Sequence, residues 1–257
     1  MPYQIASERL SFDETLERFP LHKKWAETKI ARLKRITDIP QGAKILDIGA
    51  GTGIFLAACA GLGYRCEGIE PYREARLNAA RLAGKMGVSV RITEASAEEI
   101  PFEDRTFDVV HASSVIEHVP DPEKAFKEIY RVLKPGGAFW FNAASSMCPA
   151  QNEIRAFPLF GWYPDELKRR IINWAKTRKP RLVGCTDTPA VNWFTTKRAR
   201  ALLERHGFRR VYDRWDLRME CEGGRIYALA LRGIRASRVL RMLADVIIPD
   251  CGFAAIK

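Results

Sequence analysis

Two carboxylates stand where a nucleotide-binding sheet would place its ligand. Asp47 follows the first apolar residues of ILDIGAGTGIF at residues 45–55, and Glu70 ends the apolar run of GIEPY at residues 68–72. A carboxylate beside a glycine turn repels a pyrophosphate but attracts an ammonium or sulfonium group. A carboxylate after a second strand can accept both hydroxyl protons of a ribose. The pair therefore predicts a positively charged nucleoside ligand. The alternatives are an aspartate that caps its own turn and a solvated glutamate.

The glycine turn departs from two common phosphate-binding motifs. Its spacing is GxGxG, at Gly49, Gly51 and Gly53, and Ile54 stands where the dinucleotide motif GxGxxG has its third glycine. No GK[ST] sequence follows, so the turn does not match a phosphate loop. Both departures agree with a ligand that carries positive charge.

Strands and helices alternate around these residues. We expect strands at 43–49, 64–70, 88–93, 107–113 and 138–143, and helices at 53–63, 72–87 and 121–134. Such alternation predicts an α/β fold with a doubly wound, mostly parallel sheet of seven strands in a Rossmann-like arrangement. Ligands of these sheets bind at the carboxyl ends of the strands.

The flanking regions differ from this core. Residues 11–37 predict two short helices broken at Pro20, with a capping box of Ser11 and Glu14. Residues 1–41 would form N-terminal cap helices, 42–143 the cofactor-binding core, 144–193 an inserted substrate cap and 194–257 the rest of one domain. We expect a helix that ends before Gly207 and a strand at 209–217. The segments 224–233, 235–247 and 252–257 remain alternatives for the last strand.

Four motifs in order resemble the class I S-adenosylmethionine-dependent methyltransferases. They are ILDIGAGTG, GIEP, AEEIPFEDRTFDVV and IEHVPDPEKAFKEIYRVLKPGG, within residues 42–141, with a weaker echo at 193–211. The similarity extends to the group that includes ubiquinone-biosynthesis and small-molecule O-methyltransferases. It implies S-adenosylmethionine as cofactor and S-adenosylhomocysteine as product.

The resemblance also implies which residues bind the cofactor. Asp47 and the backbone of the glycine turn would hold the methionine part, and Glu70 the ribose. Ser96 stands where the family usually has an aspartate against the adenine, and a serine accepts a hydrogen bond with less charge assistance. Tyr72 would pack on the adenine or lie on the surface. The full implied set is Asp47, Gly49, Ala50, Gly51, Gly53, Glu70, Pro71, Tyr72, Ser96, Ala97 and Ser113.

The stretch HASSVIEHVPDP at 111–122 holds the candidate base. Methyl transfer is an in-line displacement, so positioning and exclusion of water supply most of the rate. An oxygen acceptor of high pKa also needs a base within hydrogen-bond reach. His118 is the first candidate and Glu117 the second, although EHV in relatives with other substrates is also consistent with a structural turn. His111, within the strand, is interpreted as a core or rim residue.

We expect no metal site. Some ubiquinone-pathway relatives bind a divalent cation through a glutamate three residues before the Glu-His pair, and Ser114 stands at that position here. The six cysteines are scattered without a CxxC pair, which is typical of free thiols in a reducing compartment. The N-terminal residues show no secretory leader, so we expect a cytoplasmic protein.

The charge is uneven along the chain. The formal net charge is +11, and all of the excess lies in residues 136–257. Basic runs at 168–181 and 225–241, beside apolar segments, suggest peripheral contact with an anionic membrane or a phosphorylated or lipid-linked acceptor. A solvated basic face is the alternative. Nucleic acid is not expected as a partner, because no recognised binding module accompanies the charge.

Together these patterns predict an S-adenosylmethionine-dependent methyltransferase of a small molecule, acting at oxygen. One alternative is an RNA or protein methyltransferase, disfavoured because HASS replaces the NPPY-type motif after the fourth strand. Another is a regulatory module that binds the cofactor without turnover. The oligomeric state and the acceptor are not encoded in these motifs.

Overall fold

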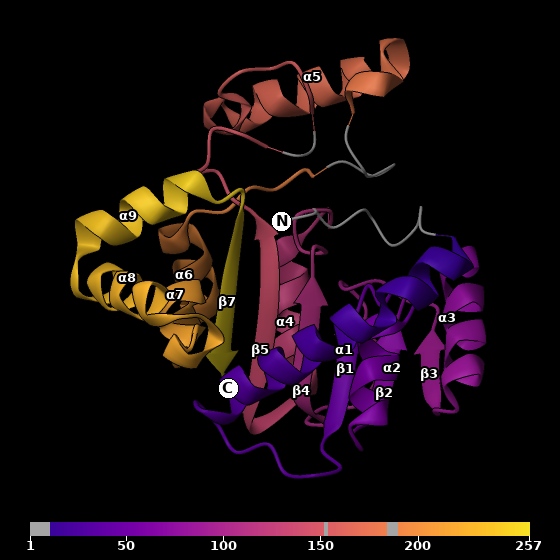
Figure 1. Cartoon of the computed structure of the whole chain (residues 1–257). Helices are drawn as coiled ribbons and strands as arrows, with labels where there is room; N and C mark the ends of the chain where they lie inside the picture. The colour runs from indigo at the N-terminus through magenta and orange to yellow at the C-terminus, as the bar shows by residue number, and fades with distance from the viewer. Residues whose placement is uncertain (1–10, 152–153, 184–189) are drawn as a thin grey trace.

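A single sheet organises the chain. The computed structural model describes residues 11–151, 154–183 and 190–257 (Figure 1). Within these ranges seven strands lie in the order β3-β2-β1-β4-β5-β7-β6. Strand β7 runs antiparallel to β5 and β6, whereas the other pairs are parallel. The predicted doubly wound, mostly parallel fold is confirmed. The strands are β1 (Lys44–Ile48), β2 (Arg65–Ile69), β3 (Val90–Thr93), β4 (Phe107–Ser113), β5 (Leu133–Ala144), β6 (Arg210–Asp213) and β7 (Asp250–Ile256).

Helices cover both faces of the sheet. Helices α1 and α2 share one hydrophobic cluster with β1 and one side of β4, and α4 and α6 share another with the opposite side. The alternation along β5 makes this division, because Phe139 and Phe141 join the second cluster and Trp140 the first. The helices are α1 (Phe12–Lys34), α2 (Ile54–Gly61), α3 (Arg73–Met86), α4 (Pro122–Val132), α5 (Asp165–Arg178), α6 (Thr196–Arg205), α7 (Arg214–Leu217), α8 (Arg225–Ala236) and α9 (Arg238–Ile247).

Helix α1 corrects one expectation. The predicted break at Pro20 is wrong, because the helix continues through this residue from Phe12 to Lys34. A proline lacks one backbone donor and usually bends or ends a helix. Here the flanking apolar residues, with Phe19 before the proline and Ile30 after it, pack on the core of the sheet. This packing stabilises the helix on both sides of Pro20. The predicted capping box of Ser11 and Glu14 is confirmed.

The carboxyl-terminal region settles the choice of the last strand. Residues 250–256 form β7 between β5 and β6, and the segments at 224–233 and 235–247 contribute to α8 and α9. The strand predicted at 209–217 is only half correct, because it ends at Asp213. The Asp213 carboxylate accepts hydrogen bonds from the amides of Trp215 and Asp216 and thereby starts α7.

The segment between β5 and α6 has a small hydrophobic cluster of its own. Figure 1 shows α5 set beyond the end of the sheet at which β5 finishes. Trp193 packs in this cluster with Phe160 and Ile172, whereas Trp162 and Trp174 are 55% and 44% exposed. The aromatic residues are therefore divided between core and surface. Residues 152–153 and 184–189 of the predicted cap lie outside the described residues.

The described cysteines form no disulfide. Cys59, Cys66, Cys148, Cys221 and Cys251 are free thiols, and Cys185 lies outside the described residues. Among the helices that the structure describes, none has both the length and the apolar character needed to span a membrane.

Candidate active site

The glycine turn after β1 is a tight cradle. Gly49, Gly51 and Gly53 have φ values of +64°, +53° and +70°, a conformation that side chains rarely adopt. A Cβ on Gly49 would lie 2.5 Å from Cγ2 of Val115, and one on Gly53 would lie 2.7 Å from Cβ of Ala79. The glycines therefore let the turn approach both the loop after β4 and helix α3. Ala50, between the first two glycines, is buried.

Glu70 joins this turn to the start of α3. Its Oε2 accepts a hydrogen bond from the amide of Gly51 at 2.8 Å, and its Oε1 accepts one from the amide of Tyr72 at 3.0 Å. The side chain is 4% exposed. Burial raises the pKa of this carboxyl, and the two amide hydrogen bonds oppose the rise. A carboxylate oxygen has two acceptor sites, so each oxygen can still accept a hydroxyl proton.

Asp47 is part of a chain of buried polar groups. Its Oδ1 lies 2.7 Å from Nδ1 of His111, and Nε2 of His111 lies 2.8 Å from Nζ of Lys29. Asp47 and His111 are direct neighbours in the β1–β4 register, and Lys29 reaches them from α1. With Asp47 ionised, Nδ1 carries the proton and Nε2 accepts from the ammonium group. The ring of His111 stacks on Phe55 with centroids 3.8 Å apart.

Burial is the main cause of the pKa shifts of Asp47, His111 and Lys29. It raises the pKa of Asp47 to about 8, and the charge of Lys29 opposes the rise. It lowers the pKa of Lys29 to about 8, and the charge of Asp47 opposes the fall. It also lowers the pKa of His111, with the positive charge of Lys29 adding to the effect. The Asp47 carboxyl is therefore one end of a hydrogen-bonded group in which the charges of Asp47 and Lys29 oppose each other.

The loop after β4 carries the candidate base. His118 has a side chain that is 20% exposed, and its Nε2 lies 3.9 Å from Oε1 of Glu117, whose side chain is 7% exposed. Ser113 ends β4 and donates a hydrogen bond from Oγ to Oδ1 of Asn142 at 2.8 Å. Ser114 has a positive φ of 56°, which marks the sharp start of the loop.

A residue from the far end of the inserted segment braces this loop. Asn192 is buried, and its side-chain amide donates to the carbonyl of Val119 at 2.8 Å and to that of Ile116 at 3.4 Å. The amides of Val191 and Asn192 both donate to the carbonyl of Glu117. Residues 191 and 192, which are distant in the sequence, thus stabilise the loop that holds His118.

The residues expected around an adenine lie beside β3. Ser96 is exposed, Ala97 is buried, and Tyr72 is 45% exposed at the N-cap of α3. The guanidinium of Arg76 donates to the carbonyls of Glu70 and Pro71 and pairs with Glu94. This arginine therefore joins the residues that follow β2 and β3. The ring of Tyr72 is exposed beside them and can cover a flat ligand.

Comparison with known proteins assigns this arrangement to a family. Residues 46–141 match the family described as methyltransferase domain. This part of the chain is a class I methyltransferase domain. The resemblance predicted from the four motifs is confirmed.

Two relatives of this methyltransferase domain match part of the chain. An uncharacterized methyltransferase of Mycobacterium leprae is 43% identical over 99 residues, which are 38% of this chain and 36% of the relative. A ubiquinone biosynthesis O-methyltransferase of Pseudomonas entomophila is 38% identical over 128 residues, 48% of this chain and 50% of the relative. The chain thus spans half or less of the length of these relatives.

Similarity of structure extends further along the chain. A Haemonchus contortus phosphoethanolamine N-methyltransferase, solved with S-adenosyl-L-methionine, aligns with a TM-score of 0.57 at 19% identity. The alignment covers 96% of this chain and 60% of that protein. At this identity the likeness establishes the fold shared with the methyltransferase.

Three residues of the candidate site were not predicted as parts of it. Lys29 has the sequence context of a solvated lysine on an amphipathic helix, and Asn192 lies in a segment without a recognisable motif. His111 was interpreted as a core or rim residue, and its pairing with Asp47 and Lys29 adds a polar role. The contact of His111 with Asp47 follows from the register of β1 and β4, which pairs two segments that are distant in the sequence.

Proposed function

We propose that this chain is an enzyme that binds S-adenosylmethionine and transfers its methyl group to an oxygen atom of a small molecule. The observation that carries the proposal is the junction of Glu70 with the glycine turn. A buried carboxylate there is bonded to the turn's own amide of Gly51, so ribose and turn would meet at one point. The Oγ1 of Thr52 is buried without a hydrogen-bond partner in the described part of the chain, which also suits a polar ligand.

The residues around the turn divide the cofactor between them. The backbone of Gly49–Gly53 and the negative end of the Asp47 chain would face the methionine part. Glu70 would accept the ribose hydroxyl protons, and Pro71, Tyr72, Ser96 and Ala97 would border the adenine. S-adenosylmethionine supplies a methyl group already activated by its sulfonium charge. The main work of the protein is then to position the acceptor in line and to exclude water.

We propose His118 as the base and Glu117 as its partner. Nε2 of His118 lies 3.9 Å from the Glu117 carboxylate, and a partly exposed imidazole beside a buried carboxylate can hold a proton taken from an acceptor hydroxyl. Ser113 is the last residue of β4, just before the loop that carries His118, and would border the space between methyl donor and acceptor. The O-methyltransferase relative supports oxygen as the acceptor atom.

The basic second half supports an acceptor or surface that carries negative charge. Helices α8 and α9 expose apolar side chains, with Ile226 at 87%, Val239 at 61% and Ile247 at 78% exposure. Arginines interrupt the same helices and no acidic residue lies between 225 and 241. This composition suits peripheral contact of a cytoplasmic protein with an anionic bilayer, from which a lipid-linked acceptor could be taken.

Calorimetry with S-adenosylhomocysteine tests the cofactor site. Gly51→Arg should abolish binding, because φ of +53° and the hydrogen bond to Glu70 leave the turn no freedom to accept a side chain. The matched control is Gly84→Arg on the outer surface of α3, where a Cβ would meet nothing within 4 Å. Equal binding by wild type and both variants would contradict the proposal.

A further inference from the structure

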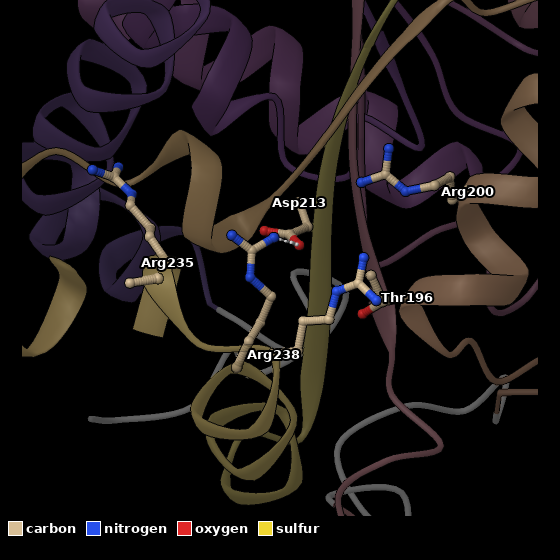
Figure 2. A pocket seen from close by; sticks show the side chains of 7 residues that line it. Thr196, Arg200, Asp213, Arg235 and Arg238 are labelled. Atoms are coloured by element: carbon tan, nitrogen blue, oxygen red, sulfur yellow. Dashed lines mark hydrogen bonds and ion pairs between the residues drawn. The ribbon is translucent and has the colours of Figure 1, made fainter. Parts of the chain in front are cut away.

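A polar cavity lies at the carboxyl end of β6, the strand that forms one side of the sheet. It has a volume of about 550 Å³ and is lined by Thr196, Arg200, Asp213, Arg235, Ala236, Arg238 and Arg241. Thr196, Arg200, Arg235 and Arg238 come from three different helices, and Figure 2 shows the side chain of Arg235 directed away from Asp213. Four guanidinium groups and one carboxylate give the lining a clear excess of positive charge.

The cavity shares an edge of the sheet with the methyltransferase site. Asp213 is in register with Phe253, which is in register with Phe141 and through it with Ala112 of β4. Three strand spacings separate β6 from β4, which is roughly 14 Å. The cavity is therefore separate from the glycine turn after β1.

The bonding of the arginines leaves cationic capacity in the cavity. Arg241 is paired with Asp213 at 2.7 Å and with Asp216 at 3.0 Å, so its charge is largely compensated. Arg200 instead donates to the carbonyl of Val211, whereas Arg235 donates to the carbonyl of Trp215 and also lies 3.9 Å from the carboxylate of Glu220. Carbonyl acceptors fix a guanidinium group without neutralising it. Arg200 therefore keeps a positive charge that no carboxylate compensates, whereas Glu220 partly compensates the charge of Arg235.

Arg238 is the most available of the four. It is exposed and makes no hydrogen bond or ion pair with the residues that the structure describes. As the first residue of α9, it lies at a helix end where a positive side chain opposes the helix dipole. Thr196 begins α6 at the same cavity, and the first turns of both helices contain no acidic residue. Such an arrangement raises the energy of the empty site and favours a bound anion.

We infer that this arginine cavity binds a phosphate group. A phosphate monoester offers several acceptor oxygens, which match the planar donors of Arg200 and Arg238 in the lining. The phosphate can belong to a soluble ester or to a lipid headgroup. On α9 the apolar stripe of Val239, Met242 and Leu243 lies beside the stripe of Arg238 and Arg241, so a bilayer could present its headgroups to the cavity.

The experiment compares two arginine variants that remove the same charge. Arg238→Gln changes the cavity, whereas Arg225→Gln changes the first residue of α8, which is exposed and outside the lining. Titration calorimetry with glycerol 3-phosphate measures the soluble ester. Flotation with vesicles of phosphatidylcholine, with and without phosphatidic acid, measures the headgroup.

We expect Arg238→Gln to weaken binding roughly tenfold in at least one arm and Arg225→Gln to leave it within about twofold. Loss of ester binding assigns the cavity to soluble phosphate compounds, and loss confined to phosphatidic acid vesicles assigns it to a headgroup. Equal behaviour of the two variants in both arms would overturn the inference, and so would failure of the wild type to bind either probe. Neither arm depends on methyl transfer, so the outcome is independent of the proposed activity.

Discussion

Nδ1 of His111 lies 2.7 Å from Oδ1 of Asp47, and both side chains are almost completely buried between α1 and the sheet. The contact joins the first strand of the cofactor turn to the strand that precedes the candidate base. Lys29 completes the chain at 2.8 Å from the other ring nitrogen. One imidazole thus separates a buried carboxylate from a buried ammonium group, and each end depends on it.

Removal of this imidazole should destabilise the fold. His111→Leu leaves Asp47 and Lys29 without their shared partner, and we expect a loss of about 3 kcal/mol in the free energy of unfolding. His206→Leu is the control, since His206 bonds the half-exposed Glu123 and should cost below about 1 kcal/mol. Urea denaturation measures both. Equal losses would mean that the hydrogen-bonded group of Asp47, His111 and Lys29 contributes no more to stability than a surface contact.

Acid should weaken the fold through histidines that stay neutral when folded. Burial, with Lys29 and Arg18 adding to it, lowers the pKa of His22 from 6.5 to about 4. Between these values the unfolded chain binds a proton that the folded chain does not, so stability is complete above about pH 6.5 and falls towards pH 4. His111 acts in the same direction.

The variant His22→Gln isolates this effect. Its unfolding free energy should decline less than that of the wild type between about pH 6.5 and pH 4. The buried carboxyls Asp47 and Glu70 act in the opposite direction, because their raised pKa favours the folded state as pH falls. They are common to both proteins and cancel in the comparison. Parallel stability curves for the two proteins would contradict the assignment to His22.

Glu70 should be the strongest single contributor to ribose binding. Glu70→Gln removes the charge of the acceptor, and we expect S-adenosylhomocysteine to bind about 10- to 100-fold more weakly. Glu67→Gln is the matched control on the same strand, where the side chain lies 3.6 Å from Lys44. Calorimetry should show that this control binds like the wild type. Similar affinities for all three proteins would remove Glu70 from the site.

His118 should affect turnover and leave cofactor affinity unchanged. We expect His118→Ala to reduce the rate by about 10²- to 10⁴-fold, the range typical of a general base. A radiolabelled methyl donor incubated with cell extracts would identify an acceptor for this assay. S-adenosylhomocysteine affinity, measured by calorimetry, serves as the control for folding. Full activity of the variant would make this histidine a structural residue of the loop.

Local patterns explain what the sequence could predict. The strand–turn–helix around Gly49–Gly53 depends on residues within a few positions, and so does the cap of α1 at Ser11. Glu70 was recognised because its place after the second strand is fixed by the alternation of elements. In each case the contact that matters lies close in sequence or follows from the order of the strands.

The remaining features depend on contacts between distant segments. Lys29 contacts His111 only because α1 packs across the sheet. Asn192 contacts the loop of His118 because the long segment between β5 and α6 returns to that loop. The same packing carries α1 through Pro20, against the local preference of proline. Strand β7 contains a glycine and two alanines, so its strand character depends on pairing on both sides. Propensity could not distinguish it from its neighbours.

The place of β7 in the sheet has a consequence for how the protein is made. Phe139 and Phe141 of β5 pair with Ala255 and Phe253 of β7, which follow more than a hundred residues later. During translation β5 leaves the ribosome well before β7 has been synthesised. During that interval an apolar strand edge stays open to other chains, which is the usual start of aggregation. Slower translation before residue 250, or a chaperone bound to β5, should therefore decide the yield of soluble protein more than the stability of the finished fold.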